Sequence, residues 1–274
     1  LKPTGGQVIT VQGNLTMSGS AAAGDTITIT SIHDDNFGLP SDTNNNGSIT
    51  APTRGDWNRI DFTAGSTGSL SHCRLRFGSN STGQGMVEMS NLSIPLSNCV
   101  FSEASHGLAL FGVSNPVLTN IAINNCSSTP VLMSVSANPT FTNITFTANA
   151  ITALGLHGED VAVSSTLAAR TVAGFTNITY YLMNGALHVV SPAVLTVSPG
   201  VVLKNQLSGG GLVIDPARKR EAIRDVLIEN GKIRDGAAGL SKGAAFAETP
   251  RVDARGHWVC PGLVDMHVHL REPG

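Results

Sequence analysis

Two histidines near the end of the chain carry the clearest chemistry in the sequence. His267 and His269 are two residues apart in the apolar stretch Leu-Val-Asp-Met-His-Val-His of residues 263–269. Alternate side chains of a β-strand point to the same face, so both imidazoles are predicted to face one side. Two such imidazoles can bind one Zn²⁺-class ion. Asp265 shares that face and is placed to orient one of the two ligands from behind.

The elements that would position this pair extend over about 70 residues. Residues 211–216 form a short apolar run that ends in Asp215-Pro216, and residues 225–233 contain Asn-Gly between two apolar segments. Asn-Gly in that setting is a strong signal for a tight β-hairpin. A turn follows at residues 253–256, and the chain then reads Asp-Met-His-Val-His-Leu-Arg-Glu-Pro-Gly from residue 265 to residue 274.

Residues 209–274 resemble the start of dihydroorotases, in the amidohydrolase superfamily. The resemblance implies part of a small β-sandwich, followed at residues 263–269 by the first strand of a (β/α)8 barrel. It implies that His267 and His269 bind zinc and that Arg271 binds the carboxylate of dihydroorotate. The implied reaction is zinc-dependent hydrolysis of a cyclic amide, in pyrimidine biosynthesis. The family's bridging carboxylated lysine, two further histidines and catalytic aspartate would lie beyond Gly274, so we expect no hydrolase activity from these 274 residues alone.

A phrase of about nine residues recurs through the first 204 residues. NPVLTNIAI at residues 115–123 returns as NPTFTNITF at residues 138–146, and shorter forms occur at residues 69–75, 94–101 and 174–180. Apolar residues alternate within the phrase, which is typical of half-buried strands, and one slip at the Thr-Asn pair indicates a bend. Steps of 22 to 34 residues with no helical stripe between them favour one coil of a parallel β-helix for each phrase.

These repeats resemble the right-handed parallel β-helix repeats of large secreted or surface-anchored bacterial proteins. We therefore predict a mainly β chain, with a β-helix followed by a truncated amidohydrolase start. The asparagines at the bends are predicted to form a hydrogen-bonded ladder from coil to coil, and the residue after each bend to stack inside. The bend residues are His72, Asn98, Asn120, Asn143 and Asn177, and the residues that follow them are Cys73, Cys99, Ile121, Ile144 and Ile178. The two cysteines are close enough for a disulfide, or they pack in the core as free thiols.

Residues 42–47, Asp-Thr-Asn-Asn-Asn-Gly, match the first half of a calcium-binding loop. Such a loop needs oxygen ligands at alternate positions and a glycine at the sharp turn. The candidate ligands are Asp42, Asn44 and Asn46, within a polar insertion at residues 34–56. The twelfth position is Thr53 rather than Glu, and a solvated Asn-rich loop is the alternative.

Charge divides the chain into two parts. Residues 1–204 hold 7 Lys and Arg with 10 Asp and Glu, whereas residues 205–274 hold 10 and 9. We interpret this step as the junction between a β-helix domain, residues 1–204, and a dihydroorotase-like segment, residues 205–274. The net charge of −2 and the 5% aromatic content give no case for a nucleic-acid partner. No apolar run approaches ~18 residues, so no membrane span is expected.

The β-helix part lacks an obvious catalytic pattern. β-Helix enzymes that cleave acidic polysaccharides need carboxylates and a basic residue on one exposed strand, but here the carboxylates cluster in the loop of residues 34–56. We expect a structural or adhesive module with a carbohydrate or other surface partner. Three interpretations of the whole chain stay open: an artificial or mis-joined composite, a surface β-helix protein with a coincidental tail, or a fragment of a longer active fusion enzyme. A secreted or surface location suits the first part, and the cytoplasm suits the second.

Overall fold

The computed structural model describes residues 6–22, 24–183, 185–205, 211–215, 220–229, 232–237 and 258–259. The chain divides into two compact units, Leu1–Lys204 and Asn205–Gly274. Every regular element in the described residues is a β-strand, which confirms the predicted mainly β fold. Within the same parts of the chain, no helix has the length and apolar character needed to cross a bilayer.

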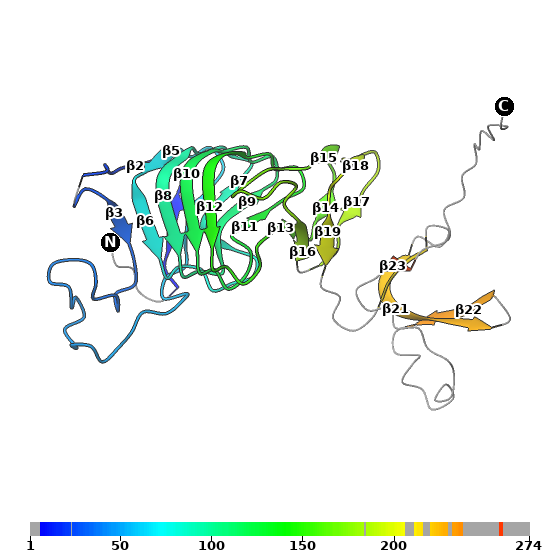
Figure 1. The fold of residues 1–274 in the computed structure, drawn as a ribbon, viewed down its shortest axis with the longest axis horizontal. Coiled ribbons are helices and arrows are strands. Elements are labelled where there is room, and N and C mark those ends of the chain that lie inside the picture. The colour runs from blue at the N-terminus through cyan, green and yellow to red at the C-terminus, as the bar shows by residue number, and fades with distance from the viewer. Residues whose placement is uncertain are drawn as a thin grey trace. The chain divides into compact units, whose positions relative to one another are not determined.

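The first unit is a stack of coils built on two long parallel sheets (Figure 1). The larger sheet has eight strands, and each strand belongs to a successive coil. In sheet order its strands are β1 (Val8–Val11), β4 (Arg59–Phe62), β7 (Gly85–Ser90), β9 (His106–Phe111), β11 (Val131–Met133), β13 (Leu154–His157), β16 (Tyr180–Met183) and β19 (Leu203–Asn205). We call it the first sheet. It runs the whole length of the stack.

The second sheet contains the recurrent phrase and has seven strands. They are β12 (Thr140–Thr147), β10 (Val117–Asn124), β8 (Leu96–Ser102), β5 (Thr67–Ser71) and β2 (Asn14–Ser18), with β6 (Cys73–Arg76) and β3 (Ile27–Ile29) beside them. Ile121 of β10 pairs with Cys99 of β8 on one side and with Ile144 of β12 on the other. The predicted repeat register is therefore the observed register. This sheet ends at β12, whereas the first sheet continues through three further strands.

Short strands complete the last coils and the second unit. In the first unit, β14 (Asp160–Val161) pairs with β17 (His188–Val189), and β15 (Ser165–Leu167) pairs with β18 (Leu195–Val197). In the second unit the strand order is β22 (Lys232–Ala237), β21 (Arg220–Glu229), β20 (Gly211–Asp215) and β23 (Trp258–Val259). The antiparallel pairing of β21 with β22 and the strand β20 match the hairpin and the short strand expected from the sequence.

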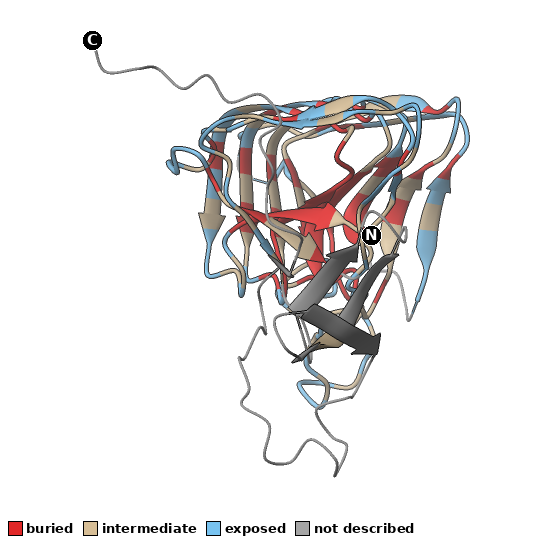
Figure 2. Ribbon diagram, turned by 90° about the vertical axis from the view of Figure 1, so that its right-hand side faces the viewer, coloured by how far each residue is buried: buried red, intermediate tan, exposed pale blue. Residues whose placement is uncertain are grey.

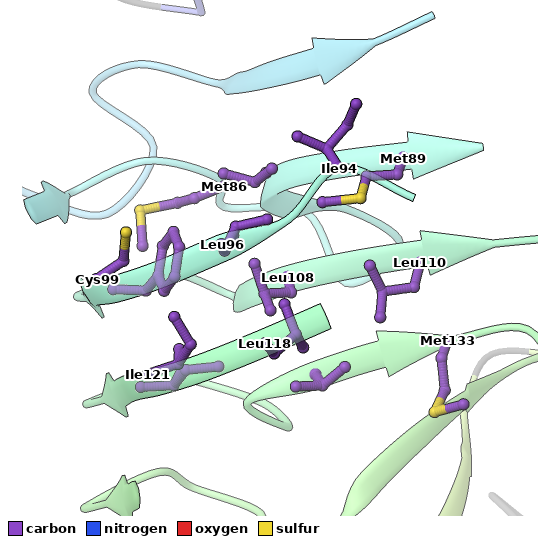
Figure 3. Packing of buried hydrophobic residues seen from close by; sticks show 14 of the residues in the cluster. Met86, Met89, Ile94, Leu96, Cys99, Leu108, Leu110, Leu118, Ile121 and Met133 are labelled. Carbon is purple, nitrogen blue, oxygen red and sulfur yellow. The ribbon is translucent and has the colours of Figure 1, made fainter. Parts of the chain in front are cut away.

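One continuous apolar core fills the inside of the coils. Buried positions line the inner side and exposed positions the outer side (Figure 2). Equivalent residues stack from coil to coil: Leu118 lies beside Leu96, and Ile121 lies beside Cys99 (Figure 3). All four are at most 1% exposed. Burying one such side chain contributes about 1.5–3 kcal/mol, so the stack is stabilised along its length rather than at one centre.

The bend recurs at all five predicted positions. His72, Asn98, Asn120, Asn143 and Asn177 share a left-handed backbone with φ between 51° and 55°. Asparagine tolerates this conformation better than most residues, because its short polar side chain can hydrogen-bond locally. The residues that follow the bends are 0–7% exposed, as expected for inward stacking.

The predicted ladder of bend residues is shorter than expected. Asn120 Nδ2 donates to Asn98 Oδ1 and Asn143 Nδ2 donates to Asn120 Oδ1, each over 2.8 Å. The bend residue of the first coil, His72, contacts the neighbouring Ser71 hydroxyl through Nδ1. The prediction was wrong for Asn177, because the second sheet ends at β12 and provides no next strand in register.

Cys73 and Cys99 are free thiols in the core, stacked one coil apart. The hydrogen bond that Cys73 donates to Cys99 raises the pKa of Cys73, as does burial, whereas the same bond lowers the pKa of Cys99. Both side chains are at most 1% exposed. The pair therefore packs as two small side chains in the core, the second of the two alternatives that the sequence left open.

Candidate functional site

The insertion between β3 and β4 leaves the coil and returns to it through buried acidic contacts. Asp34 is fully buried and accepts hydrogen bonds from the Thr30 hydroxyl and from Arg76 Nη1, the latter over 3.1 Å. The guanidinium groups of Arg74 and Arg76 both lie over the Phe37 ring, 5.3 and 5.4 Å from its centre. The insertion thus covers part of the second sheet, which a repeat-based prediction does not foresee.

Asp56 closes the insertion. Its carboxylate accepts hydrogen bonds from the Ser31 hydroxyl and from the backbone N–H and hydroxyl of Thr53. Burial alone would raise the pKa of Asp56, but these hydrogen bonds outweigh burial and lower it from its ordinary value. Asp56 therefore stays ionised and ties residue 53 back to the coil.

The turn at residues 42–47 is organised around one carboxylate. Asp42 Oδ1 accepts a hydrogen bond from the Asn46 backbone N–H over 3.1 Å, and Oδ2 accepts one from the Gly47 N–H over 2.8 Å. Gly47 has a φ of 64°, a conformation that glycine adopts readily. Asn44 and Asn46 both donate from Nδ2 to the Thr50 hydroxyl, over 3.2 and 3.0 Å. The three residues picked from the sequence are thus brought together.

A cleft of about 410 Å³ opens beside the point where the insertion rejoins the coil. Its lining residues are Pro52, Thr53, Arg54, Phe77, Asn80, Glu103 and Ser127. Arg54 Nη2 contacts Glu103 Oε2 over 3.0 Å and donates to the Asn125 carbonyl over 2.8 Å. Arg54 Nε is withdrawn from solvent and has no hydrogen-bond partner. The cleft therefore offers a charged pair, Arg54 and Glu103, beside the Phe77 ring.

The backbone at the cleft is conformationally strained. Phe77 and Glu103, which line the cleft, have φ values of 59° and 58°, in the left-handed region that disfavours residues with a side chain. A residue held there costs ~1–3 kcal/mol. Gly55, with a φ of 86°, allows the insertion to approach closely, because a Cβ at this position would lie 2.5 Å from the Cβ of Asn80.

A second charged group lies on the outer face of the first sheet. Arg59 Nη2 is 3.4 Å from Asp61 Oδ2, and Arg59 Nε is 3.4 Å from Glu88 Oε2. Burial and the neighbouring Asp61 charge raise the pKa of Glu88, although Arg59 acts in the opposite direction. No local motif in the sequence points to this group. Its signal is the register, because Asp61 and Glu88 occupy equivalent positions in adjacent coils. None of the three residues lines the cleft.

The isolated histidines of the first unit have ordinary partners. His106 is fully buried, and its Nδ1 and Nε2 lie 2.6 and 3.1 Å from the carbonyls of Thr129 and Thr82. His157 packs edge-on against the Phe111 ring, and His188 pairs with Asp160 over 2.9 Å. In the described part of the chain, no group of three or more His, Cys, Asp or Glu is arranged to hold a metal ion.

The predicted zinc and substrate residues lie outside the described residues. These are His267, His269, Asp265 and Arg271. Of the elements expected to position them, the structure describes the strands β20 to β23.

Comparison with known proteins assigns the first unit. The family described as a right handed beta helix region matches residues 15–169 and, in a second overlapping match, residues 85–241. The first match alone spans more than half of the chain. The chain belongs to the right-handed β-helix family. The sheets, register and stacked core of residues 1–204 are those expected of such a β-helix. No solved structure gives a significant match.

A different set of relatives matches a shorter segment. The chain is 50% identical over 70 residues to a dihydroorotase of Trichlorobacter lovleyi and 51% identical over 70 residues to one of Geobacter sulfurreducens. It is 47% identical over 64 residues to a dihydroorotase of Aquifex aeolicus. The first two matches cover 26% of this chain and 16% of the relative. The β-helix chain therefore also carries a partial dihydroorotase-like segment, about one sixth of the length of those relatives.

Proposed function

We propose that residues 1–204 serve as a structural or adhesive module and that residues 209–274 are the zinc-binding start of a dihydroorotase, unable to turn over substrate by themselves. The observation that carries this proposal is the small share of the enzyme that is present, 16% of the curated relatives. Identity near 50% over 70 residues argues against a coincidental tail. A surface location for the β-helix module is part of the same proposal.

The likeness to dihydroorotases assigns roles to residues at the end of the segment. His267 and His269 would hold a zinc ion, Asp265 would orient one of these ligands, and Arg271 would bind the carboxylate of dihydroorotate. Zinc supplies an activated water for attack on a cyclic amide. Two imidazoles leave most coordination positions of the ion to water, whereas catalytic zinc sites use three protein ligands. We infer that an ion held this way is bound weakly and is poorly placed for catalysis.

We expect the purified 274-residue chain, supplied with Zn²⁺, to show no dihydroorotate hydrolysis above the buffer rate. The measurement is the loss of dihydroorotate at pH 8, with the complete Geobacter sulfurreducens dihydroorotase as positive control and circular dichroism as the check of folding. Turnover that disappears in the double variant His267→Ala/His269→Ala would overturn the proposal. Sequencing of the source DNA across codons 200–210 and past codon 274 separates a mis-joined composite from a fusion gene.

For the adhesive role, we propose the cleft at Arg54 and Glu103 as the place where a carbohydrate partner would bind. Clefts of a few hundred Å³ with a few convergent polar groups are the usual form of small-ligand sites. We expect Arg54→Ala to weaken binding of any glycan that the chain captures on a glycan array by about tenfold, while Arg170→Ala, outside the cleft, leaves it unchanged. If Arg54→Ala bound the glycan as tightly as Arg170→Ala, the glycan would bind outside the cleft.

A further inference from the structure

The insertion contains an unusual concentration of unsatisfied oxygen atoms. Asp35 Oδ1, Asn44 Oδ1 and Asn46 Oδ1 are withdrawn from solvent and accept no hydrogen bond. In the described residues, seven buried side-chain nitrogen or oxygen atoms lack a hydrogen-bond partner, and these three oxygens are among them. Leaving a buried acceptor unpaired costs ~1–3 kcal/mol, so each of these oxygens calls for an explanation, and the two of Asn44 and Asn46 lie in the same turn.

Hydrogen bonds fix the orientation of two of these side-chain amides, those of Asn44 and Asn46. The amide Nδ2 atoms of Asn44 and Asn46 both point to the Thr50 hydroxyl, which itself lies 2.9 Å from His33 Nδ1. Each Nδ2 thus has a partner, while the carbonyl oxygen of the same amide has none. Asp42 lies at the centre of the same turn, and each of its oxygens accepts a single backbone hydrogen bond. A carboxylate oxygen has a second lone pair, so both keep the capacity to bind a cation.

We propose that residues 42–47 form a calcium site in which Asp42, Asn44 and Asn46 supply side-chain oxygens. The donors are carboxylate and amide oxygens at alternate positions, which suit a hard cation that accepts six to eight oxygens at flexible geometry. Zinc is disfavoured, because the nearest imidazole nitrogen, His33 Nδ1, already contacts Thr50 and Asn44. This inference does not depend on the dihydroorotase segment.

The number of charged ligands determines the affinity of the site for Ca²⁺. A tight loop of this kind ends in a bidentate Glu at its twelfth position, but that position is Thr53. Asp56, three residues further along, is instead held to the coil by three hydrogen bonds from Ser31 and Thr53, so we do not count it among the ligands. With Asp42 as the one carboxylate of the turn, we expect a Kd of about 10⁻⁴–10⁻³ M, the range of extracellular calcium modules.

The test is isothermal titration calorimetry of the full 274-residue chain with CaCl₂, beside MgCl₂, after removal of divalent ions. We expect one Ca²⁺ site, with at least about tenfold weaker Mg²⁺ binding because Mg²⁺ demands stricter octahedral geometry. Asn46→Asp adds a carboxylate at a ligand position and should tighten Ca²⁺ binding about tenfold. Asn45→Asp is the matched control, because it adds the same charge to the same turn at an exposed position between the ligands.

The outcomes separate a site from a solvated loop. If residues 42–47 are only a loop, neither the native chain nor Asn46→Asp shows Ca²⁺ heat, and the added charge beside Asp42 lowers the melting temperature regardless of Ca²⁺. Equal tightening by Asn45→Asp and Asn46→Asp would also overturn the proposal, because it would show a diffuse charge effect. As a second measurement, 5 mM CaCl₂ should slow tryptic cleavage at Arg54 in the native chain but not in Asp42→Asn.

Discussion

Trp57→Ala is expected to lower the free energy of unfolding of the β-helix by ~3–5 kcal/mol, the cost of removing a large aromatic side chain from a packed core. Trp57 is fully buried although it follows the polar insertion directly. Its Nε1–H donates to the Arg76 carbonyl over 2.6 Å. The ring occupies space that Gly78 leaves free, since a Cβ there would lie 2.8 Å from Trp57 Cζ2. The measurement is urea unfolding followed by far-ultraviolet circular dichroism.

The control for this substitution is Trp57→Phe. It keeps most of the apolar contact but removes the donor to the Arg76 carbonyl, and it should cost ~1–2 kcal/mol. A loss below ~1 kcal/mol for Trp57→Ala would show that the ring does not anchor the insertion to the core. Because the ring has no exposed surface, Trp57 cannot serve as a platform for a sugar.

Asn120→Ala is expected to cost ~2–3 kcal/mol, because it combines two effects at the middle of the ladder. The substitution removes the hydrogen bonds to Asn98 and Asn143, worth ~0.5–1.5 kcal/mol each. It also places alanine at a φ of 55°, which costs ~1–2 kcal/mol. Because the side chain is exposed, we place both contributions toward the lower end of their ranges. Urea unfolding of the full chain gives the difference directly.

Two variants divide this loss into its parts. Asn120→Gly removes the same hydrogen bonds but accepts the left-handed conformation, so it should be ~1 kcal/mol less damaging than Asn120→Ala. Asn143→Ala meets the same backbone cost but breaks a single ladder bond. If alanine and glycine at position 120 were equally destabilising, the left-handed bend would carry no strain and the ladder alone would explain the choice of asparagine.

The repeated phrase allowed much of the β-helix to be predicted. Alternating apolar residues and one slip gave the strands, the inward residues and the bend, because local backbone preference and core stacking agree at those positions. The end of the ladder was not predictable in the same way. Asn177 has the left-handed bend. However, Ile178 follows Ile144 by 34 residues, and the second sheet has no strand in that coil.

The candidate sites differ in the same way, because some are built from neighbouring residues and others from residues far apart in the sequence. The turn at Asp42 was visible because all its oxygens lie within six residues. The cleft joins residues from Pro52 to Ser127, and no local pattern reports which of them meet. The Arg59 group was overlooked for a simpler reason: its carboxylates are 27 residues apart and look unrelated until the coils are aligned. Aligning polar as well as apolar positions between coils would have revealed it.

The left-handed bend has a consequence for how such a chain can change over evolutionary time. The bends at His72, Asn98, Asn120 and Asn143 keep one backbone conformation and one sheet, while the spacing between their following residues ranges from 22 to 26. Each bend fixes the register of the strand that follows it. A coil can therefore gain or lose residues elsewhere while its inward side chains stay in register with those of the neighbouring coils. The insertion before Trp57 shows how far this freedom extends. New loops can therefore evolve on one coil while the neighbouring coils keep their register.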